Sequence, residues 1–372
     1  MRSRRLLVLI MTAVLVIACF GTSDAKAKKV RIATLPYLDY TGLVAAKALG
    51  LDQEMGLDFE FVAFPLEPQA LQAMVRGSID ITQGAIGSFI PLMPQAPELR
   101  IIVSACQFKG FLFVGREGKI TPFDEYLKKY GGDFAKAQEA TLKQFKGKTI
   151  MLVKSSFEPT VVAGLSQVGL TLDDITMMDF QNDAQAAVAF LRGIGDLYIG
   201  SLPQLTRLMK EPGYVMAAGN EVLGPAGLWY SNIATTEKYL KENPDTVRRI
   251  AAVYYRAMQY LKDQPEKALS AMVDYLNRQA ATNMTVEDAR DLVDGGFEAF
   301  STVDESIRDV YSPKSPLYWR LAADYYVKQN ELMNKIKAGA VNIDKIIVQE
   351  SIFNELVSDA ELMKWVKSPT KP

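Results

Sequence analysis

VRIATLPYLDYTGLVAAKALGLDQEMGLDFEFVAFPLEPQALQAMVRGSIDITQGAIGS, residues 30–88, is the stretch of sequence that decides the fold. Three short runs of β-branched and aromatic residues, at 30–34, 59–64 and 79–82, have the length of strands. Between the second and the third run, apolar residues at helical spacing follow Pro68 and predict a helix. Strands that alternate with helices in this way predict a parallel sheet.

The loops that follow these three runs are the first candidates for a ligand site. Ligands of parallel sheets bind beyond the carboxyl ends of the strands. The loops at 36–41, 65–67 and 83–88 would converge at that edge.

The same stretch resembles the opening of periplasmic substrate-binding proteins of ABC importers, in the branch that serves nitrate, sulfonates, taurine and thiamine-precursor pyrimidines. The motifs are the first strand and its loop, the helix end AKALGL, and GSID before the third strand. The resemblance resumes at FKGKTIMLVKSSFEPT and GIGDLYIGSLPQL and covers most of the chain from Val30 to about Thr236. It implies an α/β, two-lobed type-II periplasmic binding protein, a Venus-flytrap fold, with a helical C-terminal tail.

The length of 372 residues exceeds what one core usually supports, so two domains are expected. A second series of strand and helix patterns, at 149–200, repeats the order of the first. A more polar segment at 119–148, with a helix expected at 133–145, is where the resemblance takes the chain into the second lobe. We expect the first part of lobe 1 at 28–115, lobe 2 at 116–228, and the return to lobe 1 with the C-terminal helices at 229–372.

The C-terminal part reads as a run of helices. Asn243-Pro244-Asp245 is a helix start, because a capping residue, a first-turn proline and an acid follow one another. Further helices are expected near 286–300, 318–337 and 343–356, packed against the first lobe.

The first residues predict export. Three arginines among the first five residues precede an uncharged run at 6–17, which is the length of a signal-peptide core and short for a membrane span. We expect a signal peptide at 1–27 and a periplasmic protein. The run ends in VIAC, which resembles a lipobox, so that Cys19 would be lipidated and anchor the protein to the membrane. The alternatives are cleavage after Ala25 or Ala27 and an uncleaved anchor.

Composition disfavours several classes of function. The chain has no histidine, which removes the usual general base, the histidine-activated nucleophiles and the commonest zinc ligand. Pyrimidine synthases of this fold depend on histidine and cysteine-rich sites, and the chain cannot be one of them. Cys106 is expected to be a small buried apolar residue. With a net charge of −1 and no basic stripe, no nucleic-acid partner is expected. We expect no enzyme activity, no cofactor and no metal.

Ser155 and Ser156 are the strongest local candidates for a ligand site. They follow the strand-like run TIMLV at a helix start, where free N–H groups and hydroxyls can hold an anion. The alternative is a capping box made by Ser155 and Glu158, which needs no ligand.

The resemblance implies further contacts in the loops after the strands. A tyrosine of the first loop could stack on a planar solute or could cover the core. Trp229 could likewise contact the solute or be part of the core. Ser201 stands where many relatives carry a tryptophan-glutamate-proline turn. The full expected set is Tyr37, Asp39, Tyr40, Gln83, Ser88, Ser155, Ser156, Phe157, Ser201 and Trp229.

The expected function is that of the extracytoplasmic solute-binding component of an ABC transporter. Hinge closure would capture a small organic ligand, anionic or planar aromatic. The expected partners are this ligand and an ABC permease in the inner membrane, and the protein is expected to be a monomer. The alternative is a ligand-binding sensory protein of the same fold that feeds a membrane receptor.

Overall fold

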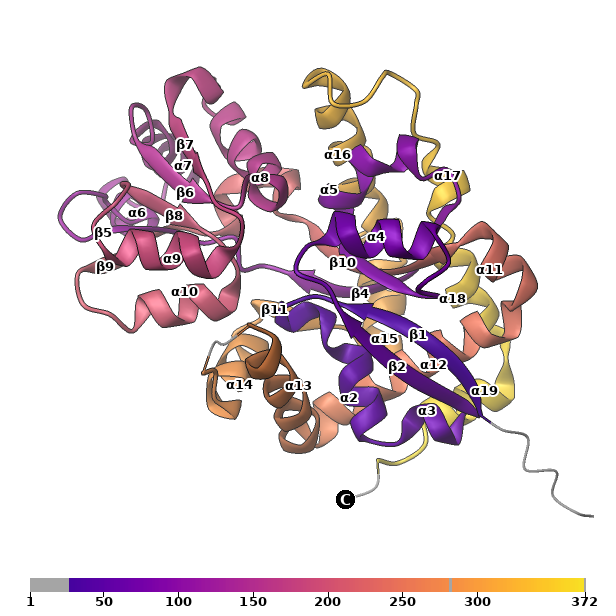
Figure 1. Ribbon diagram of the computed structural model, residues 1–372. Coiled ribbons are helices and arrows are strands. Elements are labelled where there is room, and N and C mark those ends of the chain that lie inside the picture. The colour runs from indigo at the N-terminus through magenta and orange to yellow at the C-terminus, as the bar shows by residue number, and fades with distance from the viewer. Residues whose placement is uncertain (1–26, 281–282, 371–372) are drawn as a thin grey trace, which may run out of the picture.

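The computed structural model describes residues 27–280 and 283–370 (Figure 1). Cys19 and nearly all of the expected signal peptide lie outside these residues. Two α/β lobes stand beside each other, one with the sheet of β5 to β9 and the other with the sheets of β1 to β4, β10 and β11 (Figure 1). None of the helices at 27–280 and 283–370 combines the length and the apolar character needed to cross a bilayer.

The first lobe is built on a mixed sheet. β1 (Lys28–Thr34) and β2 (Leu57–Ala63) pair in parallel, from Lys28 opposite Leu57 to Thr34 opposite Ala63. A bridge between Ile32 and Ile81 joins β1 to the start of β3. β10 (Trp229–Thr236) runs antiparallel between β3 (Thr82–Ala85) and β4 (Leu99–Phe108), and β11 (Glu298–Phe300) pairs with the end of β4. The strand order is therefore β2-β1-β3-β10-β4-β11.

The third expected strand lies later in the chain than the sequence indicates. Only Ile81 bridges to β1, and the ladder with β10 holds residues 82–85 in the sheet. The short helical elements of this lobe are η1 (Leu38–Tyr40), α2 (Gly42–Ala48), α3 (Leu51–Glu54), α4 (Glu67–Val75), α5 (Ile86–Phe89) and η2 (Ile90–Gln95).

The second lobe repeats this arrangement. Its strand order is β7-β6-β8-β5-β9, which corresponds to β2-β1-β3-β10-β4 of the first lobe. In both sheets the two outer strands on one side are parallel, and the fourth strand runs antiparallel to its neighbours. The strands are β5 (Phe113–Arg116), β6 (Thr149–Leu152), β7 (Thr176–Asp179), β8 (Leu197–Ile199) and β9 (Tyr214–Ala218), and the helices are α6 (Phe123–Lys129), α7 (Phe134–Lys143), α8 (Lys154–Ser166), η3 (Leu172–Asp174), α9 (Asp183–Leu191) and α10 (Leu202–Met209).

The chain crosses between the lobes twice. It leaves the first sheet after β4 at 109–112 and returns at 219–228, where η4 (Asn220–Gly227) leads into β10. Because β5 hydrogen-bonds to β8 and β9, the first crossing precedes the expected boundary at residue 115. The lobes touch closely here, since a Cβ on Gly110 would lie 2.6 Å from the Leu202 side chain.

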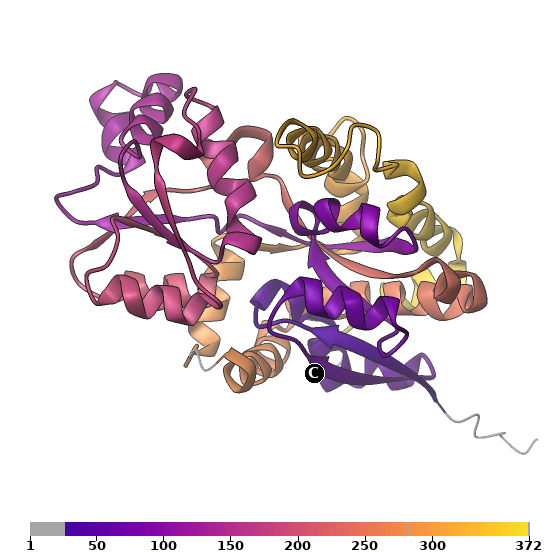
Figure 2. The same cartoon turned by 45° about the horizontal axis from the view of Figure 1, so that its top comes forward.

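The remaining helices cover the first lobe. In Figures 1 and 2 the gold and yellow C-terminal segments lie on its side. The helix expected at 286–300 ends at Asp294, because Gly296 adopts φ 73° and the chain turns into β11. The elements are α11 (Glu237–Glu242), α12 (Pro244–Asp263), α13 (Pro265–Ala280), α14 (Val286–Asp294), α15 (Val303–Glu305), the π-helical turn η5 (Ser306–Val310), α16 (Trp319–Leu332), α17 (Ile343–Ile346), α18 (Gln349–Ser358) and α19 (Ala360–Val366).

Candidate functional site

A cavity lies between the lobes, at the carboxyl ends of strands from both sheets. Its empty volume is about 430 Å³, including its opening. The first lobe and its returning segments contribute Tyr37, Leu38, Asp39, Tyr40, Glu67, Ser88, Phe108, Phe111, Trp229 and Glu298, and the second lobe contributes Ser156, Phe157, Ser201 and Leu202. This is the position that the parallel-strand pattern indicates for a ligand.

Most of the expected site residues line this cavity. The structure brings together Tyr37, Asp39, Tyr40, Ser88, Ser156, Phe157, Ser201 and Trp229. Each lies in a loop or first helical turn directly after a strand, or at the start of β10.

Gln83 and Ser155 do not line the cavity. The Gln83 side chain is buried within the first lobe, where its Nε2 donates to the carbonyl oxygens of Ala33 (3.2 Å) and Tyr40 (2.9 Å). Ser155 is exposed, because α8 begins one residue earlier and turns this side chain outward. The capping box with Glu158 does not form either, since α8 has no side-chain cap.

Aromatic rings form one wall of the cavity. The Phe111 ring stands edge-on to Trp229 (centroids 4.8 Å apart, 90°) and to Phe108 (4.9 Å, 79°). Trp229 in turn meets Tyr326 of α16 at 5.3 Å. Phe111 comes from the first crossing and Trp229 directly follows the second, so this wall lies where the chain passes between the lobes.

Two carboxylates occupy equivalent positions in the two lobes. Glu67 is the first residue of α4 and accepts hydrogen bonds from the Tyr40 hydroxyl and from Ala85 N (3.1 Å). Asp183 is the first residue of α9 and accepts from the Tyr198 hydroxyl (2.6 Å), Ser201 N (2.6 Å) and the Ser201 hydroxyl.

These two carboxylates hold the N-termini of helices that face the cleft. Glu67 lies at the start of α4 and binds the N–H at the N-cap of α5, and Asp183 does the same for α9 and α10. Helix N-termini attract anions. Here the protein's own carboxylates take those positions.

Asp39 and Glu298 are the other two acidic groups of the cavity. Asp39 is 5% exposed and accepts from the Ser231 hydroxyl, whereas Glu298 is 1% exposed and accepts from the Cys106 thiol (3.3 Å). Burial raises the pKa of Asp39 to about 7. Burial, and then the charge of Asp39, raise the pKa of Glu298 well above its usual value.

A larger hollow adjoins the cavity and forms its mouth. It has an empty volume of about 1130 Å³ and shares Tyr37 and Ser201 with the inner cavity. Residues 63–66 line one side and residues 182–184 the other. Neither lining includes a lysine or an arginine, so the charged groups of this cleft within the described chain are all acidic.

Ion pairs join the lobes beside the cleft. Lys335, which follows α16, pairs with Glu158 of α8 (2.8 Å). Lys210, which follows α10, pairs with Asp288 of α14 (2.6 Å). Both pairs connect the second lobe to C-terminal segments that pack on the first.

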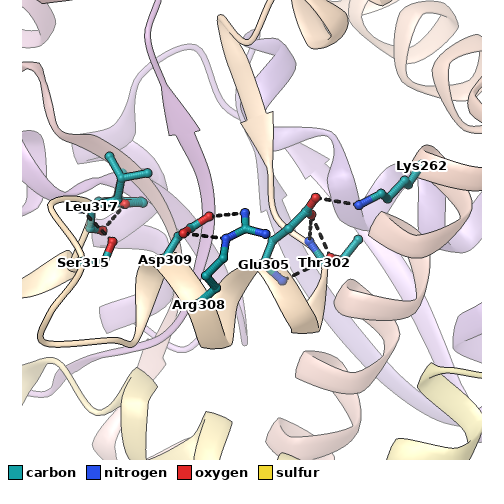
Figure 3. Close-up of polar contacts among 8 residues, drawn as sticks. Lys262, Thr302, Glu305, Arg308, Asp309, Ser315 and Leu317 are labelled. Carbon is teal, nitrogen blue, oxygen red and sulfur yellow. Dashed lines mark hydrogen bonds and ion pairs between the residues drawn. The ribbon is translucent and has the colours of Figure 1, made fainter.

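Another hollow lies behind the first sheet, beside the π-helical turn. Three of its charged side chains are in ion pairs: Glu305 pairs with Lys262 (2.6 Å), and Arg308 with Asp309 (2.5 Å), as Figure 3 shows. Residues of one lobe and its returning segments line it. It is therefore a weaker candidate than the cavity between the lobes.

Comparison with known proteins agrees with this architecture. Residues 116–268 match the family model described as NMT1/THI5 like. A protein of Brucella abortus (strain 2308), named as a binding protein, is 25% identical over 265 residues, which are 69% of this chain and 75% of that protein. YtlA of Bacillus subtilis (strain 168), also named as a binding protein, is 22% identical over 253 residues, 65% of this chain and 69% of YtlA.

Solved structures show the same fold. The periplasmic aliphatic sulphonate-binding protein SsuA of Escherichia coli superposes with a TM-score of 0.64 at 18% identity, over 86% of this chain and 92% of SsuA. The periplasmic nitrate-binding protein NrtA of Synechocystis PCC 6803 gives a TM-score of 0.64 at 12% identity, over 92% of this chain and 90% of NrtA. The expected resemblance to periplasmic substrate-binding proteins and the expected two-lobed fold are confirmed.

Some residues of the cavity are not among those expected from the sequence. Phe108 and Phe111 belong to a run that reads as ordinary strand. Glu298 falls in a segment whose pattern predicts a helix. Glu67 could have been predicted as a cavity residue, since it directly precedes Pro68 in one of the three converging loops.

Proposed function

We propose that this chain is the extracytoplasmic solute-binding component of an ABC importer, which captures a small organic solute between its lobes and presents the closed form to a permease. The observation that supports this most is the cavity between the lobes, built at the strand ends of two sheets of the same topology. The solved structures of the same fold are of proteins named as binding proteins.

Closure would be a hinge motion about the two crossings. The residues at 109–112 and 219–228 connect the lobes, and rotation there would separate Tyr37 of the first lobe from Ser201 of the second. The ion pairs of Lys335 and Lys210 would break on opening. The solute therefore adds its own contacts to a closed state that the protein already favours in part.

Binding at micromolar Kd requires a net free energy of about −8 kcal/mol. A few charge-assisted hydrogen bonds, at about 1.5–3 kcal/mol each, and one aromatic contact reach that value after ordering costs. The cavity offers carboxylates, hydroxyls and rings for this purpose. Recognition and release need no covalent step.

The test is a closure assay on the mature protein. Solutes of varied charge are screened by thermal shift, and hits are followed by small-angle scattering, which reports the fall in radius of gyration on closure. Hits are then tested for stimulation of ATP hydrolysis by the permease encoded nearest to this gene, in vesicles. A solute that is chemically converted, or saturable binding without closure, would refute the proposal. Closure without permease stimulation would favour the sensory alternative.

A further inference from the structure

We propose that the captured solute carries a cationic, N–H-bearing head, a protonated amine or amidine, which lies between Asp39 and Glu298 with aromatic rings around it. This inference rests on the proposed function, because it names the class of solute that the same cavity takes. It differs from the expectation of an anionic ligand that the helix starts suggest in the sequence.

The charges around the cleft are the first ground. Asp39, Glu67 and Glu298 line the cavity, Asp183 lines its mouth, and neither lining has a lysine or an arginine. Burial raises the pKa of all four carboxyls, and an anion beside them would raise it further and find no cationic side chain to pair with. A cation would lower these pKa values again, because each ionised carboxylate would then lie beside an opposite charge.

The helix N-termini do not reverse this conclusion. Glu67 accepts from the N-cap N–H of α5, Asp183 accepts from that of α10, and the Asn182 side chain caps α9. The start of α8 has a similar arrangement, because Lys154 N donates to Asp179 (2.9 Å). At α5, α8 and α10, a carboxylate of the protein therefore occupies an N–H group that an anion could otherwise bind.

Asp39 and Glu298 differ from Glu67 and Asp183 in their hydrogen bonding. Asp183 accepts from two hydroxyls and a backbone N–H. Glu298 accepts from a thiol, which is a weak donor. A buried carboxylate without a cation is costly, and a cationic ligand between these two groups would remove that cost. Asp39 and Glu298 line the same cavity, so one ligand head can contact both.

The aromatic wall is the second ground. Tyr37, Phe108, Phe111 and Trp229 line the same cavity as the two carboxylates. Ring faces attract cations, by about 2 kcal/mol or more in a dry site, and Trp is the best of them. Rings combined with carboxylates therefore favour an ammonium or amidinium group over a neutral or anionic one.

The experiment uses matched one-ring probes on the purified mature protein: benzamidine and benzylamine as cations, benzoate and benzenesulfonate as anions, and 4-aminopyrimidine as a neutral donor. Calorimetry gives Kd, and small-angle scattering reports closure. The variants are Asp39→Asn and Glu298→Gln, which keep shape and remove charge. Asp304→Asn, whose ion pair with Lys367 is remote from the cavity, is the control.

We expect the cations to bind and close the protein, with at least about tenfold weaker binding in each cavity variant and no change in the control. Far-UV circular dichroism and the melting temperature establish that both variants fold. If one fails to fold, the other carries the test.

Three outcomes would overturn the inference. Closure by benzoate or benzenesulfonate alone, retained in both variants, would overturn the cationic class and leave the proposed function standing. Closure by 4-aminopyrimidine alone would do the same in favour of a neutral ring. Failure of every probe to bind at millimolar concentration would overturn the cationic class, and failure of the wider solute screen as well would overturn the proposed function.

Discussion

The ion pair between Lys335 and Glu158 gives a measurable prediction about closure. Glu158 has two lysine partners, Lys335 across the cleft at 2.8 Å and Lys154 on its own helix at 3.4 Å. The Glu158 side chain is 9% exposed and that of Lys335 32%, so the pair is partly protected from solvent. Its contribution should therefore be near the upper end of the range for surface pairs, about 1 kcal/mol.

Only the pair with Lys335 depends on closure. Lys335→Met should therefore shift the open–closed equilibrium about fivefold toward the open form, and weaken solute binding by up to the same factor. Lys154→Met is the matched control, because it removes a lysine from the same carboxylate without breaking a link between lobes.

The assay is single-molecule energy transfer between dyes placed on the two lobes, which reports the closed fraction with and without solute. The difference between the two variants should shrink as salt rises, since charges at this depth are partly screened. Equal effects of Lys335→Met and Lys154→Met, or no effect of either, would refute the role of this pair in closure.

Three further predictions concern stability and are checked by urea unfolding. The folded-state pKa of Asp39, about 7, lies above its usual 3.8, so between these pH values the folded protein retains a proton that the unfolded chain has released. The free energy of unfolding should therefore fall as pH rises through this range, by at most about 4 kcal/mol. Asp39→Asn should flatten this pH profile, and an unchanged slope would contradict the burial of Asp39. Gly87→Ala places a Cβ against the Trp229 ring and 3.0 Å from Tyr326, and should cost about 1–3 kcal/mol by crowding alone. Gly118→Ala has open space around it but a positive φ to accommodate, so comparing the two variants separates crowding from backbone strain. Phe111→Ala removes a buried ring that stands edge-on to three others, and should cost about 3–5 kcal/mol. A loss below about 1 kcal/mol would mean that the wall is loosely packed.

Much of the architecture can be predicted from the sequence because local rules and the fold agree. Strand-length apolar runs became β1, β2, β6 and β7, and Asn243 with Pro244 starts α12 as the pattern indicates. The repeat of strand and helix patterns in the second half corresponds to a second sheet of the same strand order.

The failures lie where tertiary contacts overrule local pattern. Glu298 is in a strand because it pairs with the edge of β4, and no pattern in the sequence around Glu298 predicts this pairing. Ser155 points outward because α8 starts one residue early, which is a difference that propensity cannot resolve. The sequence places serines and tyrosines at the strand ends correctly, but it does not reveal that Glu67 and Asp183 bind the N–H groups at the starts of the helices next to their own.

The filling of those helix starts by Glu67 and Asp183 has a consequence for selectivity in the natural medium. Phosphate, sulfate and nitrate are abundant outside cells, and each would compete for free backbone N–H groups at a helix N-terminus. A receptor that supplies its own anions at those positions would be insensitive to such competition. The fraction of receptor with solute bound would then depend on the solute concentration and not on the concentration of inorganic anions.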